Sequence, residues 1–315
     1  MLSRIAESLY WVGRYVERAE DTARILEVHV VHLLEDPSVS EEAACRTLLG
    51  VMGVPEPEGT LDATRVTEIL AFDPVDASSI AGSWVAARQC ARGIREVLSS
   101  EMWECLNATY NTLPSLSERA ARVGPHAFFQ YVREKSAVLA GLTDSTLSRD
   151  DGWRFLVLGR SLERLDMTTR LLLAQFSEPA GLAEWMTTLA CCSAYEAYLR
   201  TYRRGVEPSL VAEFLLLDRL FPRSAFHALS MAEQCLTELE PATGRAGLED
   251  EARRILGQAR VELEFRRVEE LIADLPVRLH ALQAVCAQAS DAVTRRYFRL
   301  TAPLEWSLEG AGASP

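Results

Sequence analysis

The segment Gly13-Arg14-Tyr15-Val16-Glu17-Arg18 returns 146 residues later as Gly159-Arg160-Ser161-Leu162-Glu163-Arg164. Thr22 and Arg24 follow the first copy at the spacing at which Thr168 and Arg170 follow the second. Most of the matched positions are charged, and charged residues on a solvated helix face have little reason to stay matched between two parts of one chain. We therefore interpret the chain as a tandem duplication.

Further matches follow in the same order at a spacing of 145 residues. They pair Val66–Leu70 with Val211–Leu215, Asp73 and Ser79 with Asp218 and Ser224, and Gln89-Cys90 with Gln234-Cys235. A first helical repeat is therefore predicted over residues 1–148 and a second over residues 149–300, followed by a C-terminal tail over residues 301–315. The repeats could form two domains or one intertwined bundle, because each could complete the core of the other.

Helical periodicity dominates the chain. One long helix is predicted from Leu2 to about Glu35, because apolar residues recur at helical spacing along it: Ile5, Leu9, Val12, Val16, Ala19, Ala23 and Leu26. We expect Pro114 to interrupt a helix and a single helix to run from Glu184 to Arg203. No segment shows strand alternation, so an all-α helical bundle with short connections is predicted.

Composition narrows the function classes. The net charge of −12 disfavours nucleic acids and anionic membranes as partners, which prefer a positive surface. No apolar run approaches the roughly 20 residues needed to cross a bilayer, and the N-terminus lacks the regions of a signal peptide. The seven cysteines are odd in number and form no spaced framework, which indicates core residues in a reducing compartment. We expect a soluble, cytoplasmic protein.

The duplicated helix has two faces. Helical geometry puts the apolar positions on one stripe and most charged positions of the motif on the opposite side. A glycine inside a helix costs up to about 1 kcal/mol relative to alanine, so Gly13 and Gly159 predict the close approach of another backbone or a ligand at the charged face. Three interpretations stay open: a buried ion network between the copies, a polar ligand site, and solvated salt-bridge ladders.

A ligand site would suit the chemistry of these side chains. Arginine forks match carboxylate or phosphate, and glutamates could orient the forks or receive an amine. Leu156 and Ser161 stand where the first copy has Tyr10 and Tyr15, so one copy alone could be competent. The candidate residues for substrate or anion binding are Tyr10, Arg14, Glu17, Arg18, Arg24, Arg160, Glu163, Arg164 and Arg170.

Other sites receive little support. His29 and His32 are three residues apart but belong to no metal-binding motif, so a packing or solvated role and no metal are expected. Cys191-Cys192 has no local histidine, which argues against a catalytic thiolate. No phosphate-binding glycine loop, nucleophile elbow or dinucleotide fingerprint is present. The sequence therefore predicts no cofactor and no ATP binding, and it assigns no catalytic residue.

The segment Met1–Glu20 strongly resembles the start of the bacterial Alpha-E family, an all-helical family named for a Glu-Arg motif. Other blocks that resemble the family are Asp76–Ile80, Ala87–Asn107 (notably Arg95–Glu104) and Phe214–Ser224. The resemblance covers nearly the whole chain to about Leu300. It implies a connection with circularly permuted ATP-grasp ligases and transglutaminase-like proteins, and hence with ATP-dependent peptide or amide formation.

The leading expectation is a helical accessory subunit of an ATP-grasp-type peptide or amide ligase, which binds the amine or carboxylate substrate at the duplicated Arg/Glu face. Amino acids or peptides are the expected substrate class. The first alternative is a stand-alone enzyme that acts on amino-acid or peptide substrates with Glu17 or Glu163 as general base. The second is a purely structural scaffold.

Overall fold

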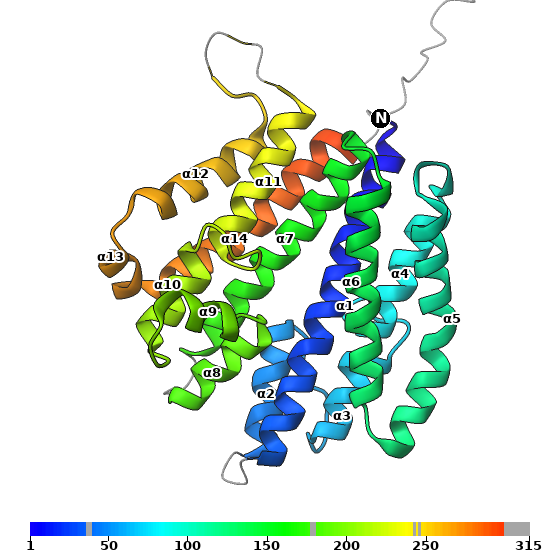
Figure 1. Cartoon of the computed structure of the whole chain (residues 1–315), viewed down its shortest axis with the longest axis vertical. Coiled ribbons are helices and arrows are strands. Elements are labelled where there is room, and N and C mark those ends of the chain that lie inside the picture. The colour runs from blue at the N-terminus through cyan, green and yellow to red at the C-terminus, as the bar shows by residue number, and fades with distance from the viewer. Residues whose placement is uncertain (36–39, 177–180, 242–243, 245–246, 299–315) are drawn as a thin grey trace, which may run out of the picture.

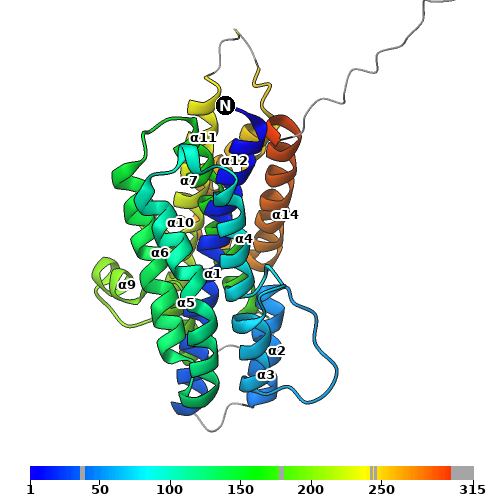
Figure 2. The ribbon, with the colours of Figure 1, turned by 90° about the vertical axis from the view of Figure 1, so that its right-hand side faces the viewer.

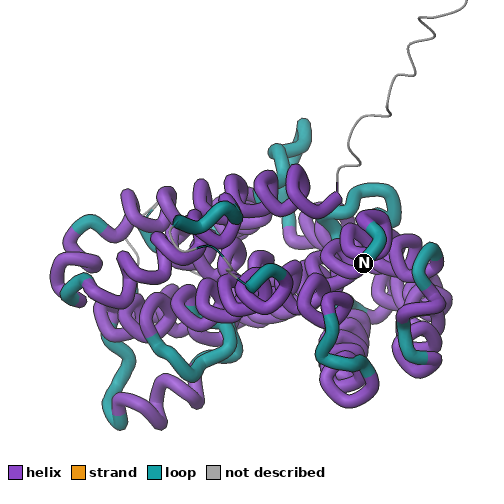
Figure 3. The backbone as a smooth tube through the Cα atoms, turned by 90° about the horizontal axis from the view of Figure 1, so that it is seen from above, coloured by secondary structure: helices purple, strands orange, loops and turns teal. Residues whose placement is uncertain are grey.

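The computed structural model describes residues 1–35, 40–176, 181–241, 244 and 247–298, and the side chains of residues 31–35 are not described. Figure 3 shows this part of the chain as helices and loops, and it contains no strand. The all-α prediction is therefore confirmed. The predicted tail over residues 301–315 lies outside the described residues.

Two four-helix bundles make up most of the molecule. In the first, α1 packs against α4 and α6, and α5 closes the ring between them; in the second, α7 packs against α11 and α14, and α12 closes the ring. The first bundle consists of α1 (Ser3–Glu35), α4 (Ile80–Arg92), α5 (Ser100–Val123) and α6 (His126–Thr146). The second consists of α7 (Asp151–Ala174), α11 (Ala225–Leu239), α12 (Glu251–Phe265) and α14 (Leu275–Val293). Figure 2 shows α4, α5 and α6 from the side of the first bundle.

Shorter helices gather mainly at the end of the molecule away from the N-terminus (Figure 1). They are α2 (Glu41–Met52), α3 (Ala63–Thr67), α8 (Leu182–Cys191), α9 (Tyr195–Tyr202), α10 (Pro208–Leu217) and α13 (Val268–Ala273). A π-helical turn at Glu68–Phe72 extends α3, a 3-10 turn at Arg95–Val97 follows α4, and a second π-helical turn at Thr294–Phe298 extends α14. This last turn packs against α1, so the end of the second bundle touches the first.

The helices α1 and α7 form the centre of the molecule (Figure 1). Buried apolar residues of both bundles belong to one continuous cluster, which includes Trp84 and Phe128 in the first bundle and Leu229 in the second. Between Leu9 and Leu26, nearly every residue of α1 is buried, including the charged ones except Arg18, which is half-buried. The charged face that the sequence pattern separates from the apolar stripe is therefore a helix–helix interface, which excludes the solvated ladder.

Matched sequence blocks adopt matched local structures. The hydroxyl of Ser79 donates to the carbonyl oxygen of Asp73 and accepts from the backbone N–H of Gly82 at 2.9 Å, which caps α4. The hydroxyl of Ser224 donates to the carbonyl oxygen of Asp218 and accepts from the backbone N–H of His227 at 3.1 Å, which caps α11. These caps agree with the duplication, which stays an interpretation of the sequence.

Two expected helix boundaries are wrong. Pro114 lies inside α5, which continues on both sides of it. Because Pro114 is on the exposed face, water can satisfy the carbonyl group that the proline ring leaves without a donor. The segment from Glu184 to Arg203 holds two helices, because Ser193 takes a left-handed conformation with φ +49° between α8 and α9.

Candidate functional site

The helices α1 and α7 touch through their glycines. A Cβ atom on Gly13 would overlap the carbonyl oxygen of Leu156, and a Cβ atom on Gly159 would overlap the carbonyl oxygen of Tyr10. Tyr10 therefore faces Gly159 while Arg14 pairs with Glu163 four residues further along both helices, so α1 and α7 run in the same direction. The predicted close approach at the two glycines is confirmed, and the group that approaches is backbone.

Glu163 on α7 accepts hydrogen bonds from two arginines of α1. The Nε atom of Arg14 donates to Oε2 at 2.6 Å, while Arg18 donates from Nε to Oε1 at 2.6 Å and from Nη2 to Oε2 at 3.2 Å. Arg14 also donates from Nη1 to the hydroxyls of Tyr10 and Ser290, both at 3.3 Å, and these hydroxyls lie 2.9 Å apart. The carboxylate of Glu163 and the two hydroxyls thus bind both arginines on this side of the interface.

Glu17 on α1 is held in the reverse direction. Arg164 donates from Nε to Oε1 at 2.6 Å and from Nη2 to Oε2 at 3.1 Å, and Arg223 donates from Nη1 to Oε1 at 2.7 Å. The Glu-Arg pairs of the two motifs are thus exchanged: Glu17 binds Arg164 and Glu163 binds Arg18. We call the six residues of these contacts the Arg–Glu cluster: Arg14, Glu17, Arg18, Glu163, Arg164 and Arg223.

Arg223 was missed by sequence reasoning. It lies in the turn before α11, and it occurs within the block Phe214–Ser224 that resembles the family, but nothing in the pattern connects that block with the motif helices. Its guanidinium also contacts Glu20 and donates to Asp21 Oδ1 at 2.7 Å. Arg223 therefore joins the second bundle to three carboxylates of α1.

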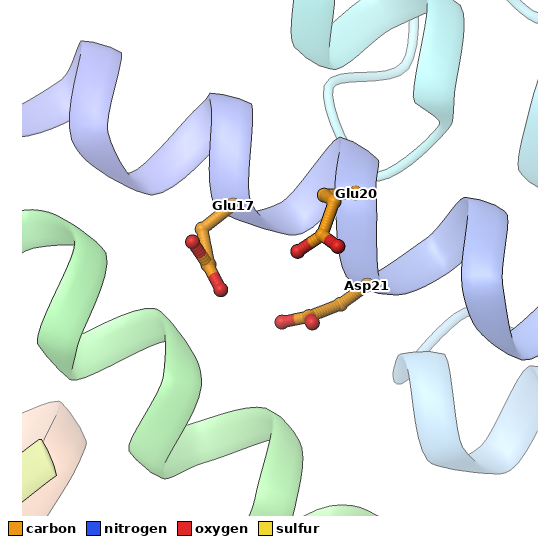
Figure 4. A group of neighbouring side chains, drawn as sticks. All are labelled: Glu17, Glu20 and Asp21. Carbon is orange, nitrogen blue, oxygen red and sulfur yellow. The ribbon is translucent and has the colours of Figure 1, made fainter. Parts of the chain in front are cut away.

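Those three carboxylates lie on one side of α1 (Figure 4). Oxygen atoms of Glu17, Glu20 and Asp21 fall within 4.8 Å of one another, a spacing that a metal ion could use. Arg223 contacts all three, and Glu20 also pairs with Arg24. Since guanidinium groups supply the compensating charge, this group of acids is part of an arginine-centred network.

The two motif glutamates are ionised at neutral pH. Burial by itself would raise the pKa of Glu163, but Arg14 and Arg18 lower it to about 2. Burial likewise opposes ionisation of Glu17, and Arg164 and Arg223 hold its pKa below its usual range. Asp21 behaves in the opposite way, because burial and the charge of Glu17 raise its pKa despite the contact with Arg223.

Arg160 stands apart from these pairs. Among the described residues it makes no hydrogen bond and no ion pair. Its side chain lines a cavity of about 190 Å³ between α1, α6 and α7, which we call the Arg160 cavity. Its wall comprises Val12, Gly13, Val16, Glu17, Glu20, Ser136, Ala137, Leu139, Ala140, Thr143, Leu156, Arg160, Arg164 and Arg223.

The remaining two predicted site residues differ in position. Arg24 belongs to the edge of the network, because it pairs with Glu20. Arg170 does not reach the cluster: it donates from Nε to Asp166, four residues before it on α7, at 3.0 Å, and from Nη1 to the carbonyl oxygen of Val51 at 3.3 Å. It therefore ties α7 to α2. The structure brings the other predicted site residues together around α1 and α7.

The weaker candidates of the sequence gain no support. His29 has Nδ1 at 2.9 Å from the carbonyl oxygen of Ile25, as in a helix-internal contact, and the side chain of His32 lies outside the described residues. Burial raises the pKa of the Cys192 thiol to about 12 and raises that of Cys191 as well, so neither is a reactive thiolate. Within the described ranges, no helix is long and apolar enough to span a bilayer.

Comparison with known proteins gives a family and distant relatives. A family model described as "a predicted alpha-helical domain with a conserved ER motif" matches residues 1–298. Uncharacterized proteins of Mycobacterium bovis and of two strains of Mycobacterium tuberculosis are 26% identical to this chain over an alignment of 330 positions. The alignment covers 92% of this chain and 36% of each relative. The chain thus spans about a third of the length of these curated relatives. No solved structure matches it.

Proposed function

Because this chain belongs to the Alpha-E family, we propose that it is a helical component of an amide-bond-forming system, which docks to a circularly permuted ATP-grasp ligase and holds a substrate of that ligase. In this proposal the ligase binds ATP and activates a carboxylate. The helical chain contributes a rigid, arginine-rich binding site. A transglutaminase-like protein is a further proposed partner, and an amino acid or peptide is the proposed substrate class.

One observation carries the proposal: most charged residues of the two motifs pair with one another, whereas Arg160 lines a cavity. The Arg–Glu cluster joins α1 to α7 through charges that compensate one another. Arg160, from the same motif, has no hydrogen-bond or ion-pair partner in the part of the chain that the structure describes, and it lines a cavity beside that cluster. A rigid frame with one uncommitted guanidinium is suited to binding an anionic group in a defined orientation.

The electrostatics disfavour a stand-alone enzyme with Glu17 or Glu163 as general base. A general base works best when its pKa is near the operating pH. Two arginines lower the pKa of Glu163 to about 2, and Glu17 is held below its usual range in the same way. A carboxylate stabilised so strongly accepts a proton poorly, which supports a binding role over catalysis by these residues.

The greater length of the relatives supports a role for this chain as one part of a larger system. The match covers 92% of this chain but 36% of each relative, so in those proteins an equivalent helical region accompanies a longer stretch of polypeptide. Such an arrangement fits a domain that acts beside another one. We propose the ATP-grasp partner from the family resemblance, and the fold contributes the rigid site.

A reconstitution experiment tests the proposal. The chain and a circularly permuted ATP-grasp ligase from the same genome would be co-expressed, and ADP release with a panel of amino acids would be measured with and without the chain. We expect stable co-purification and an increase in ADP release of at least tenfold when the chain is present. Arg160→Met should lose this increase, while Arg149→Met, at an exposed arginine, should keep it.

Three outcomes would count against the proposal. Failure of the ligase and the chain to associate would remove the partner role. Full activity of a complex that carries Arg14→Ala, Glu17→Gln and Arg18→Ala would leave only a scaffold, because the motif would then contribute nothing to turnover. If the isolated chain showed turnover that is lost in Glu17→Gln, the stand-alone enzyme would replace the partner role.

A further inference from the structure

The two sides of the α1–α7 interface are filled differently. On the Arg14 side, the buried ring of Tyr10 occupies the space, and its hydroxyl bonds with Arg14 and Ser290. On the Arg160 side, Leu156 stands at the position that matches Tyr10, and the Arg160 cavity of about 190 Å³ opens beside it. Because leucine has neither the ring nor the hydroxyl of tyrosine, Leu156 leaves the cavity open and offers Arg160 no hydrogen-bond acceptor.

Arg223 explains why Arg160 forms no ion pair with a carboxylate of the described residues. Glu163 is held by Arg14 and Arg18, so the matching partners of Glu17 would be Arg160 and Arg164. Arg164 is present, but Arg223 from the second bundle takes the other position on Glu17. Arg160 thus forms no ion pair with Glu17, although its charge still lowers the pKa of Glu17, and it stays half-buried beside the interface.

A second polar group of the cavity wall is also unused. Ser136 on α6 is 5% exposed, and its hydroxyl has no hydrogen-bond partner among the residues that the structure describes. A buried hydroxyl without a partner costs about 1 to 3 kcal/mol, and a serine in a helix commonly avoids this cost by bonding to the preceding turn. Thr143, on the same wall, does so by donating to the carbonyl oxygen of Leu139 at 2.8 Å. Ser136 therefore has a hydroxyl that no described group uses, on the helix that forms one wall of the cavity, and a rotation about its Cα–Cβ bond would bring this hydroxyl to the cavity.

The unused groups select the chemistry of a ligand. Arg160 offers N–H donors and Ser136 offers an O–H donor, whereas the carboxylates on the wall, Glu17 and Glu20, already bind arginines. An amine would find no uncommitted carboxylate. Burial and the charge of Arg164 also lower the pKa of Arg160, although the charges of Glu17 and Asp144 act in the opposite direction. An anionic acceptor would satisfy both groups.

Size and charge narrow the ligand further. The cavity is smaller than the roughly 300 to 1,000 Å³ of sites for drug-sized molecules, and its volume equals about six water molecules at roughly 30 Å³ each. Glu17 and Glu20 on the wall repel a second negative charge. A singly charged carboxylate suits this wall better than a phosphate with two charges.

We propose that the Arg160 cavity between α1, α6 and α7 binds a small monocarboxylate, whose oxygen atoms accept hydrogen bonds from the guanidinium of Arg160 and, once its side chain rotates towards the cavity, from the hydroxyl of Ser136. Carboxylate binding follows from the cavity alone. That this ligand is the acid substrate of amide formation rests on the function proposed above. Ala137 and Ala140, the less buried residues of α6 in the wall, lie where the ligand enters.

Titration of the full chain tests the proposal directly. Sodium acetate, methylammonium chloride and inorganic phosphate would be added at constant ionic strength and pH 8, while the Nε–H resonances of the arginines are followed by NMR. We expect saturable acetate binding that shifts the Arg160 resonance, with weaker binding of phosphate and none of methylammonium. The dissociation constant for acetate should rise at least tenfold in Arg160→Met.

Two further variants separate binding from folding. Ser136→Ala removes only the hydroxyl without a partner, so it should leave thermal stability unchanged or higher and weaken acetate binding several-fold. Leu156→Tyr fills the cavity as Tyr10 fills the opposite side, and it should abolish acetate binding in a folded protein. Acetate binding that persists in both variants would overturn the proposal, as would phosphate or methylammonium binding more tightly than acetate.

The result is independent of the partner experiment. If acetate fails to shift the Arg160 resonance while the chain still activates a ligase, the cavity assignment is wrong and the partner role stands. If acetate binds as expected but no ligase associates, the carboxylate site stands and the partner role falls.

Discussion

Gly13 faces the backbone carbonyl of Leu156 so closely that a Cβ atom on Gly13 would overlap the carbonyl oxygen. Gly159 makes the same kind of contact with Tyr10 on the other helix. Two backbones in contact bring the arginines of each helix within reach of the glutamate on its neighbour. The ion pairs of the Arg–Glu cluster therefore depend on the absence of two side chains.

Gly13→Ala and Gly159→Ala should each destabilise the protein, because the added methyl group meets backbone, which cannot move aside as a flexible side chain would. We expect a loss of about 1 to 3 kcal/mol or more in the free energy of unfolding, measured in urea. Gly141→Ala is the matched control, since Gly141 lies in α6 with open space around it. This control should gain up to about 1 kcal/mol from helix propensity, and equal behaviour of all three variants would contradict the prediction.

Arg223→Met should be among the most damaging single substitutions of a charged residue in this chain. It removes the partner of three buried carboxylates, Glu17, Glu20 and Asp21, and breaking a buried ion pair on one side costs about 3 to 5 kcal/mol. Arg46→Met provides the comparison, because Arg46 pairs with Glu42 at the surface and such pairs contribute about 0 to 1 kcal/mol. Urea unfolding of the two variants would show whether the costs differ as expected.

Stability should fall in acid partly through Glu163. The ordinary pKa of a glutamate is 4.5, and the pKa of Glu163 in the folded protein is about 2. A carboxyl group whose pKa is lower in the folded than in the unfolded state stabilises the folded protein at pH values above the unfolded pKa. That contribution, about 3 kcal/mol from the shift, is lost as the pH falls from about 4.5 towards 2.

Glu163→Gln isolates this effect. The difference in unfolding free energy between the native protein and the variant should be largest above pH 5 and should shrink as the pH falls towards 2, where the native carboxyl also becomes neutral. Glu104→Gln, at an exposed glutamate, controls for the loss of one negative charge. A difference for Glu163→Gln that is constant across this pH range would show that its carboxylate does not contribute through ionisation.

The predicted repeats should not fold alone. Fragments 1–148 and 149–315 would each expose one side of the α1–α7 interface, where the glycine contacts, the exchanged ion pairs and part of the continuous core lie. We expect each fragment to lack a cooperative thermal transition by circular dichroism, and the mixed fragments to recover helicity and elute as one complex. A cooperative transition in either isolated fragment would instead favour two independent domains.

Helical periodicity and the repeated motif predict much of the fold. The α-helical class, the long first helix and the close approach at Gly13 and Gly159 all follow from local spacing, because a glycine within a helix has a cost that a close contact explains. The prediction failed at Pro114 and Ser193. A proline on an exposed face can remain in a helix supported by packing, and a left-handed serine leaves little trace in the pattern.

The site could be predicted only in part. Matched charges identified Arg14, Glu17, Glu163 and Arg164, since duplication marks them without any structural knowledge. Arg223 could not be found, because it reaches Glu17 from a turn 206 positions along the chain. For the same reason the sequence does not show that Arg14 is paired and Arg160 is not. That difference depends on Arg223, which occupies the position on Glu17 that Arg160 would otherwise take.

The exchange of Glu-Arg partners between the two motifs has a consequence for how this sequence can evolve. Glu17 accepts from Arg164 at a separation of 147 positions, and Glu163 accepts from Arg18 at a separation of 145. A change in one motif removes the counter-charge of the other, so the two motifs are inherited as one unit despite their distance in the gene. Among homologous sequences, substitutions at positions 17 and 164 should therefore occur together, and recombination that brings in only one half should be selected against.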